Sequence, residues 1–361
     1  MDTNRMWEDR IFGRRVAVSD TVSFTSSSAP IGCFDPDRGI VYAAYHASRD
    51  KYGEQVEVLA LAAIPVAQPH RSENIVLLEH GVPKDGKAYS YPIDASTVFI
   101  NGHVRVYFLA DGTDYYYVDY DPATREESPV RRVFCSIGGK RAPLSDAAVD
   151  GYLSAHGFSG YNLNFDSKEH VINSSKPAYH NGIRYGALTS GYSQPIIFST
   201  SDAETFEFRG IIPKIAKYET QVAIAGGNMY ALLRGAEGCN YYVSRDLGLT
   251  FEETPWRVPM SETRPQLMEY KGKVLMAYSL LGIKPNLMRD GRNNMRLLLG
   301  DGDDASKYAE VFFIQDKYGI VYYDLINYKN VLYMLWSNAD LYLDKSLHGK
   351  DLLYFARIGE L

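Results

Sequence analysis

The amino-acid sequence predicts an all-β protein, a six-bladed β-propeller with one short helical insertion, and three observations support this fold class. Tyr is unusually frequent, at 29 of the 361 residues, and aromatic and β-branched residues favour strands. Helical periodicity is scarce, and short apolar segments alternate with turn residues, which is typical of sandwiches, barrels and propellers. A strand–turn–strand unit recurs six times along the chain, as a propeller built from small sheets requires.

The recurring unit is a short strand, a turn that carries Gly or Asn, and a second apolar strand. Gly and Asn readily adopt the positive φ that tight hairpin turns need. The six turn residues are separated by 63, 80, 45, 45 and 58 positions, so we expect one hairpin in each blade. The predicted hairpins span residues 30–47, 94–110, 176–189, 220–234, 264–279 and 322–337, with turns at Gly39, Gly102, Gly182, Gly227, Gly272 and Asn330.

We expect residues 1–361 to form one domain, because single propellers reach this length. Residues 1–25 are expected to form either an N-terminal arm or a strand that closes the last blade. The long separation between the second and third turns predicts an insertion between blades two and three, at residues 131–175. Within it, Leu144–His156 is the best helix candidate, because it begins with a Ser-Asp pair typical of a helix N-terminus.

Composition and charge exclude several classes of protein. The formal net charge is −6, from 38 basic and 44 acidic residues, so we expect no broad basic surface for nucleic acid. No apolar run reaches 18 residues, which predicts no membrane insertion. Residues 1–18 carry charges throughout and lack an apolar core, so we expect no signal peptide and a chain that is cytoplasmic as synthesised or part of a virus particle.

Cysteine usage and ligand spacing predict neither a metal site nor a cofactor. The three cysteines, Cys33, Cys135 and Cys239, are widely separated and odd in number. This pattern indicates neither a disulfide framework nor a zinc site. The chain shows no cluster of residues with metal-ligand spacing, so we expect no bound metal and no cofactor.

A turn motif follows the fourth hairpin. Ser244–Phe251 has the form S-x-D-x-G-x-T-F of an Asp box. Its Asp side chain is expected to accept backbone N–H groups of the turn, and its Gly to supply a positive φ. Thr200–Phe206 is a degenerate copy, one residue shorter and without the Gly, and Gly300–Asp304 occupies the place of a third copy. We expect these motifs to stabilise turns and not to be catalytic.

Four segments make the chain resemble the sialidase (neuraminidase) family of exo-acting glycoside hydrolases, which are six-bladed propellers. Tyr218–Val222 resembles the family segment whose Glu partners the nucleophile, and Met229–Arg234 resembles the strand that ends in a substrate-binding Arg. Gly291–Leu297 resembles the stretch that bears a further Arg of the family's Arg triad. Tyr322–Leu325 resembles the Y-S-D-L strand that carries the nucleophilic Tyr. The likeness is clearest from residue 176 onward.

This resemblance implies a role for each matching residue. Tyr322 would be the nucleophile and Glu219 its activating base, while Arg234 and Arg292 would bind the substrate carboxylate. Arg suits planar carboxylates, and a neutral Tyr avoids the repulsion that a carboxylate nucleophile would meet at an anionic sugar. Strand alternation directs only one of Tyr322 and Tyr323 to the axis, and the motif selects Tyr322.

The chain departs from the family pattern in blade one. Where the family has its first triad Arg in an R-I-P motif, this sequence has Ser28–Ile31, with Ser28 in the Arg position. Asp50, on the loop after the next strand, is the expected acid, and Arg49 beside it is a candidate to replace the lost guanidinium. Arg264, in Thr-Arg-Pro at the start of the fifth hairpin, is a further candidate.

Two functions remain open from the sequence. The first is a sialidase-like, retaining exo-glycoside hydrolase that acts on glycans ending in a sialic or related acidic sugar, and the retained Glu, Arg and Tyr residues favour it. The second is a non-catalytic glycan-binding or virion structural propeller, which the missing Arg favours. Each candidate site residue could instead have a purely structural role. The arginines could form surface ion pairs, Tyr322 could pack in the core, and Asp50 could stabilise a turn.

Overall fold

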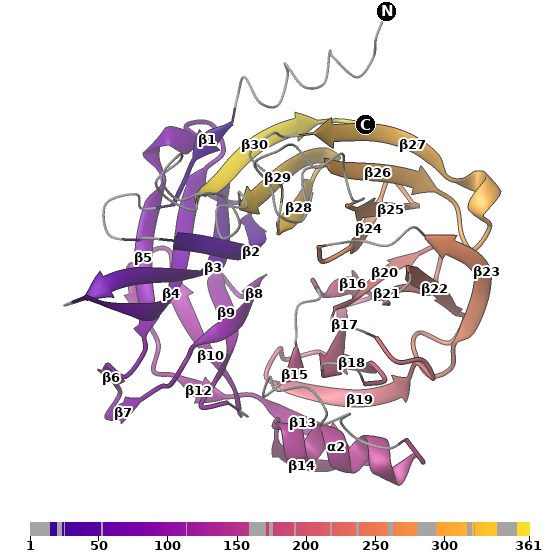
Figure 1. Cartoon of the computed structure of the whole chain (residues 1–361), viewed down its shortest axis with the longest axis horizontal. Helices are drawn as coiled ribbons and strands as arrows, with labels where there is room; N and C mark the ends of the chain where they lie inside the picture. Colours follow the sequence, from indigo (N-terminus) through magenta and orange to yellow (C-terminus); the bar gives the residue numbers. More distant parts are fainter. Residues whose placement is uncertain are drawn as a thin grey trace, which may run out of the picture.

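The protein is a ring of six antiparallel β-sheets around a central axis (Figure 1). The predicted six-bladed propeller is therefore confirmed. The computed structural model of the chain describes residues 15–19, 24, 26–51, 53–112, 114–158, 171–172, 176–190, 193–216, 219–235, 238–258, 263–279, 294–315, 320, 322–337 and 352–361.

The main strands of each blade follow chain order from the axis outward, except that blade three adds the earlier β13 and β14 at its outer edge and the last blade is completed by β1. Blade one contains β2 (Ser26–Asp35), β3 (Ile40–Lys51), β4 (Glu54–Pro65) and β5 (Glu73–Glu79). Blade two contains β8 (Ile93–Ile100), β9 (His103–Ala110), β10 (Asp114–Asp121), β11 (Glu126–Glu127) and β12 (Arg131–Arg132). Blade three contains β15 (Val171–Ile172), β16 (Ala178–His180), β17 (Ile183–Ser190), β18 (Ile196–Thr200) and β19 (Thr205–Ile211).

Blade four contains β20 (Thr220–Ala225), β21 (Asn228–Arg234), β22 (Cys239–Ser244) and β23 (Glu252–Val258). Blade five contains β24 (Gln266–Tyr270), β25 (Lys273–Tyr278), β26 (Asn294–Gly300) and β27 (Ala309–Gln315). Blade six contains β28 (Tyr323–Tyr328), β29 (Val331–Ser337), β30 (Leu353–Gly359) and β1 (Val16–Ala17). A two-stranded ribbon and two single turns of 3₁₀-helix lie outside these sheets: β6 (Pro83–Lys84), β7 (Lys87–Ala88), η1 (Pro69–Arg71) and η2 (Ala305–Lys307).

The six predicted turns each connect the innermost strand of a blade to its second strand. Their turn residues all have positive φ, between +65° and +82°. Five of the turns are two residues long, as at Asn101–Gly102, and both residues have positive φ. This turn geometry matches the right-handed twist of the paired strands. The positions of Gly and Asn in the sequence therefore locate every inner hairpin.

The hairpin geometry gives the ring two distinct faces. We call the face that carries the six turns the turn face, and the opposite face, at which the innermost strands begin, the start face. Because strands alternate in direction, residues at the beginning of an innermost strand and at the end of the second strand share the start face. Residues far apart in sequence therefore meet around the axis at this face.

The ring is closed by pairing between the two ends of the chain. β1 runs antiparallel to β30, with Val16 opposite Phe355 and Ala17 opposite Tyr354. The Ser19 hydroxyl accepts a hydrogen bond from the backbone N–H of Leu353 at 3.0 Å. Residues 16 and 17 thus add an outer strand to the last blade.

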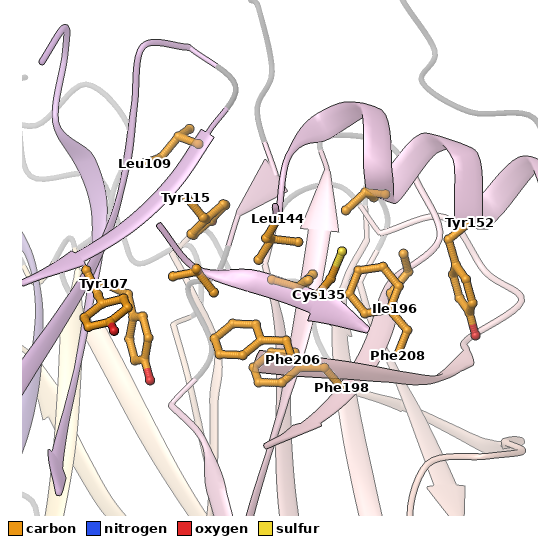
Figure 2. Close-up of a cluster of buried hydrophobic side chains, with 14 of the residues drawn as sticks. Tyr107, Leu109, Tyr115, Cys135, Leu144, Tyr152, Ile196, Phe198, Phe206 and Phe208 are labelled. Carbon is orange, nitrogen blue, oxygen red and sulfur yellow. The ribbon is translucent and has the colours of Figure 1, made fainter. Parts of the chain in front are cut away.

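Blade three carries additional structure on its outer edge. β13 (Phe134–Ile137) and β14 (Lys140–Pro143) form a hairpin, and β13 runs parallel to β19. The helix α2 (Asp146–Ala155) follows, with Ser145 as its N-cap, so the predicted helix is confirmed. Figure 2 shows side chains from this insertion packed against blades two and three. Phe198 and Phe206 stack within the cluster, with ring centroids 4.1 Å apart.

The side chain of Asp246 accepts hydrogen bonds from backbone N–H groups of its own turn. Asp246 Oδ1 accepts from the backbone N–H of Leu249 at 3.1 Å and of Thr250 at 2.9 Å, while Gly248 has a φ of +91°. Burial alone would raise the pKa of Asp246, but hydrogen bonds from Thr250 and Ser244 lower it to about 2. The shorter motif at residues 200–206 has the same arrangement, in which one Asp side chain caps two backbone N–H groups.

The described residues contain no helix that is long and apolar enough to cross a membrane. Cys33, Cys135 and Cys239 are buried and are not paired in disulfides.

Candidate functional site

An ion pair between Glu219 and Arg234 lies at the start face of blade four. Glu219 directly precedes β20, and Arg234 ends β21, so the hairpin register places the two residues side by side. The Arg234 N–H donates to the Glu219 carbonyl at 3.1 Å, and Arg234 Nη1 donates to Glu219 Oε2 at 2.8 Å. Each residue is only 6% exposed. Removing one partner would leave a buried charge uncompensated.

Tyr322 joins this pair from blade six. It directly precedes β28, and its carbonyl accepts a hydrogen bond from the Ser337 N–H at 2.9 Å. Burial alone would lower the pKa of Arg234, but the Glu219 carboxylate and, more weakly, the Tyr322 hydroxyl raise it. Tyr322 is half-buried, whereas Tyr323 lies fully within the core between blades five and six. Strand alternation thus separates the two neighbouring tyrosines, as we expected.

Arg264 lies at the start face between three blades. It precedes β24 and is 5% exposed. Its Nη2 donates to the Pro30 carbonyl at 2.9 Å and to the Tyr323 carbonyl at 3.0 Å. These bonds fasten blade five to blades one and six, so part of the guanidinium has a structural role.

The remaining predicted residues lie farther out or are not described. The hairpin of β3 and β4 extends past the beginning of β2, and Asp50 sits at its exposed tip, where it accepts a hydrogen bond from the Gly53 N–H at 2.8 Å. Arg49 forms an ion pair with the buried carboxylate of Glu79. Arg292 falls outside the described residues.

Asp94 also lies at the start face, although no motif in the sequence marks it as a site residue. It lies at the beginning of β8, in a β-bulge, with a φ of +51°. Burial and the Glu219 carboxylate raise the pKa of Asp94, while His46 and Arg264 lower it, and the balance is a pKa of about 6. The side chain is therefore half protonated near pH 6, about two units higher than an ordinary Asp. A bulge of this kind has no clear local signal that would have revealed the residue.

We expect Asp94→Asn to stabilise the protein above pH 6. A raised carboxyl pKa means that the folded state binds the proton more tightly, so stability falls as pH rises from about 4 to about 6. One pKa unit corresponds to about 1.4 kcal/mol. The free energy of unfolding at pH 8 should therefore exceed that of the wild type by about 1–3 kcal/mol, with no difference near pH 4. Urea unfolding at several pH values measures this.

Asp37→Asn is the matched control, because it makes the same chemical change at an exposed turn position away from the site. Equal stability of the wild type and Asp94→Asn at pH 8 would contradict the expected charge burial at Asp94.

Beneath these residues a polar layer crosses the central channel. Asp324, in β28, is 2% exposed and accepts hydrogen bonds from the Gly32 N–H at 2.8 Å and Gln266 Nε2 at 2.6 Å. Lys176, from blade three, reaches the same carboxylate at 3.1 Å. Blades three and six lie opposite each other in the ring, so this ion pair bridges the channel. No local pattern in the sequence indicates that these residues meet.

The arrangement at the start face suits recognition and transfer of an anionic group. Two buried arginines supply positive charge, Tyr322 supplies a hydroxyl near the Glu219–Arg234 ion pair, and Asp94 supplies a carboxyl group with a pKa of about 6. The described residues contain no group of His, Cys, Asp and Glu side chains that could hold a metal ion.

Solved structures share this architecture at low sequence identity. The Trypanosoma rangeli sialidase superposes with a TM-score of 0.59 and 14% identity over 92% of this chain. The Hadza microbial sialidase Hz136 gives 0.64 and 12% over 96%, and a mutant of NanB sialidase from Streptococcus pneumoniae gives 0.53 and 14% over 95%. The chain has the propeller fold of the sialidases.

The match covers only part of those proteins. The chain spans 55% of the Trypanosoma rangeli enzyme, 68% of Hz136 and 70% of the NanB mutant. No protein-family model matches the sequence, and no curated protein matches it. The structural likeness therefore establishes the fold alone.

Proposed function

We propose that the chain is a sialidase-type exo-glycoside hydrolase for glycans that end in a sialic or related acidic sugar. The observation that carries the proposal is the grouping of Glu219, Arg234 and Tyr322 at the start face of the propeller. In this proposal Arg234 and Arg292 hold the sugar carboxylate, because guanidinium groups bind carboxylates through paired hydrogen bonds. The turn motifs at Asp202 and Asp246 are then Asp boxes of the same family.

Tyr322 is the nucleophile in this scheme. Its hydroxyl gives its proton to Glu219 as its oxygen attacks the anomeric carbon, and the bond to the leaving oxygen breaks. Water then releases the sugar from the tyrosine with net retention of configuration. The Trypanosoma rangeli sialidase has been solved with sialic acid and as a covalent intermediate with 2,3-difluorosialic acid, which supports a covalent step in a propeller of this fold.

Two carboxyl groups compete for the role of the acid that protonates the leaving oxygen. The family resemblance selects Asp50, which is exposed on a hairpin tip. The structure offers Asp94, whose pKa of about 6 leaves it protonated below that pH, as a general acid requires. Aryl glycosides with good leaving groups need little acid assistance, so loss of the true acid should slow poor leaving groups selectively.

The test is a hydrolysis assay with a panel of nonulosonic and uronic acid glycosides. We expect turnover of at least one nonulosonic acid glycoside by the wild type. Asp50→Asn and Asp94→Asn should then differ in their pH profiles and in their dependence on the leaving group, which identifies the acid. Lack of hydrolysis of every glycoside, with the fold intact by circular dichroism, would overturn the proposal.

A non-catalytic propeller is the second candidate, and two observations favour it. Arg234 donates to a buried carboxylate, and Arg264 donates to two backbone carbonyls, so both arginines already serve the fold. The family's first Arg is replaced by Ser28. In this alternative the protein binds acidic glycans without cleaving them, as a free protein or as part of a virus particle. Glycan binding without turnover would select it.

A further inference from the structure

A cavity of about 510 Å³ lies at the turn face, at the opposite end of the channel from the candidate site. It is lined by later residues of the innermost strands of all six blades, such as Phe34 in blade one and Tyr328 in blade six. Its volume falls within the range of small-molecule sites, about 300–1,000 Å³.

The polar layer separates this cavity from the candidate site. Lys176 lines the cavity, and its Nζ donates to the Asp324 carboxylate at 3.1 Å and to the Leu325 carbonyl at 2.9 Å. Asp324 is in turn bound by Gln266 and by the backbone of Gly32. A ligand in the cavity therefore binds beneath this layer and does not share the candidate site.

The walls of the cavity are aromatic. Phe34 and Tyr328 stack on each other, with ring centroids 4.0 Å apart, and Phe99 lines the neighbouring blade. Tyr179 stands at the rim and is 66% exposed, although it is a large aromatic side chain. Aromatic faces of this kind stack against planar rings and against the apolar faces of sugars.

Arg184 supplies a positive charge to the cavity, and the carboxylate of Glu269, which also lines it, accepts a hydrogen bond from the Gly272 N–H at 2.6 Å. Its Nη2 donates to the Phe99 carbonyl at 3.3 Å, and its guanidinium lies 5.5 Å from the ring of Tyr179. In the described part of the chain, no carboxylate forms an ion pair with Arg184. A half-buried guanidinium beside aromatic rings is a strong binder of carboxylates, because it offers paired donors in one plane.

We propose that this cavity is a second ligand site for a small carboxylate that carries a ring, with Arg184 as the anchor of the carboxylate. The ring stacks on the aromatic wall formed by Phe34, Phe99 and Tyr328. The ring belongs either to a sugar acid or to an aromatic acid, since both classes present a carboxylate beside a face that can stack. The proposal does not depend on hydrolysis at the start face.

Nuclear magnetic resonance of the full chain with labelled isoleucine methyl groups tests the proposal. Ile224 and Ile326 line the cavity and report binding there. The probes are N-acetylneuraminate, glucuronate, benzoate and 4-hydroxybenzoate, titrated to about 20 mM, beyond the millimolar dissociation constants of weak sites. We expect saturable shifts of both methyl groups with at least one probe. Saturation by sugar acids alone, or by aromatic acids alone, identifies the class of ring.

Arg184→Met should weaken that binding by about tenfold or more, because it removes charge-assisted hydrogen bonds. Arg184→Lys should weaken it less. Arg209→Met is the matched control, since Arg209 also donates to one carbonyl, that of Leu247 at 3.0 Å, and lies 5.6 Å from the ring of Tyr185. Absence of saturable shifts with every probe, or equal affinity of the wild type and a folded Arg184→Met, would overturn the proposal.

Discussion

Tyr322→Phe is expected to lower turnover of an acidic glycoside by at least about a thousandfold, the scale of loss when a catalytic nucleophile is removed. The change deletes only a hydroxyl at a half-buried position beside Arg234, so the fold and the binding of the glycan should persist. Initial rates and a separate titration with the unreacted glycoside give the two quantities.

Tyr323→Phe is the control for this experiment. Its ring is fully buried in the core between blades five and six, so the same deletion one residue later should leave turnover within a few-fold of the wild type. A loss in stability of about 1 kcal/mol is the ordinary effect of removing a buried hydroxyl. Equal turnover by wild type and Tyr322→Phe would rule out Tyr322 as the nucleophile.

The second large effect is expected for Asp324→Ala. This substitution leaves Lys176 and Gln266 facing each other without the carboxylate that holds both, and it strips the acceptor from the buried Gly32 N–H. Breaking a buried ion pair by removing one partner costs about 3–5 kcal/mol. The free energy of unfolding, measured by urea denaturation, should fall by that amount.

Asp324→Asn separates charge from hydrogen bonding. The amide oxygen can still accept from Gly32 or Gln266, so this variant should lose less stability than Asp324→Ala. If Asp324→Ala were to lose under about 1 kcal/mol, the range of a surface ion pair, the polar layer would have little part in holding the blades together.

The hairpins could be predicted because their information is local. Asn101–Gly102, like the other two-residue turns, requires positive φ at both positions, and few residues besides Gly and Asn supply it without strain. The pairing of Glu219 with Arg234 can also be predicted from the sequence, because the two residues belong to one hairpin. Once the hairpin is recognised, its register places the two side chains together.

The rest of the site depends on how blades assemble. Asp94 and Glu219 are 125 positions apart in the chain, and Lys176 meets Asp324 across 148. Such contacts follow from the closure of the ring and not from any local pattern. Arg264 shows the same limit, because its sequence position marks a blade start but its hydrogen bonds go to backbone carbonyls of two other blades.

The pairing of Val16 and Ala17 with Phe355 and Tyr354 has a consequence for how the chain folds during its synthesis. Blades one to five consist of consecutive segments, so each can assemble as soon as its own strands leave the ribosome. The last blade combines β1 with strands from the other end of the sequence, so β1 stays without a partner until β30 has been synthesised. During that interval an open edge can pair with another nascent chain. Ring closure is therefore the step at which this protein is most exposed to domain exchange between neighbouring copies on a polysome.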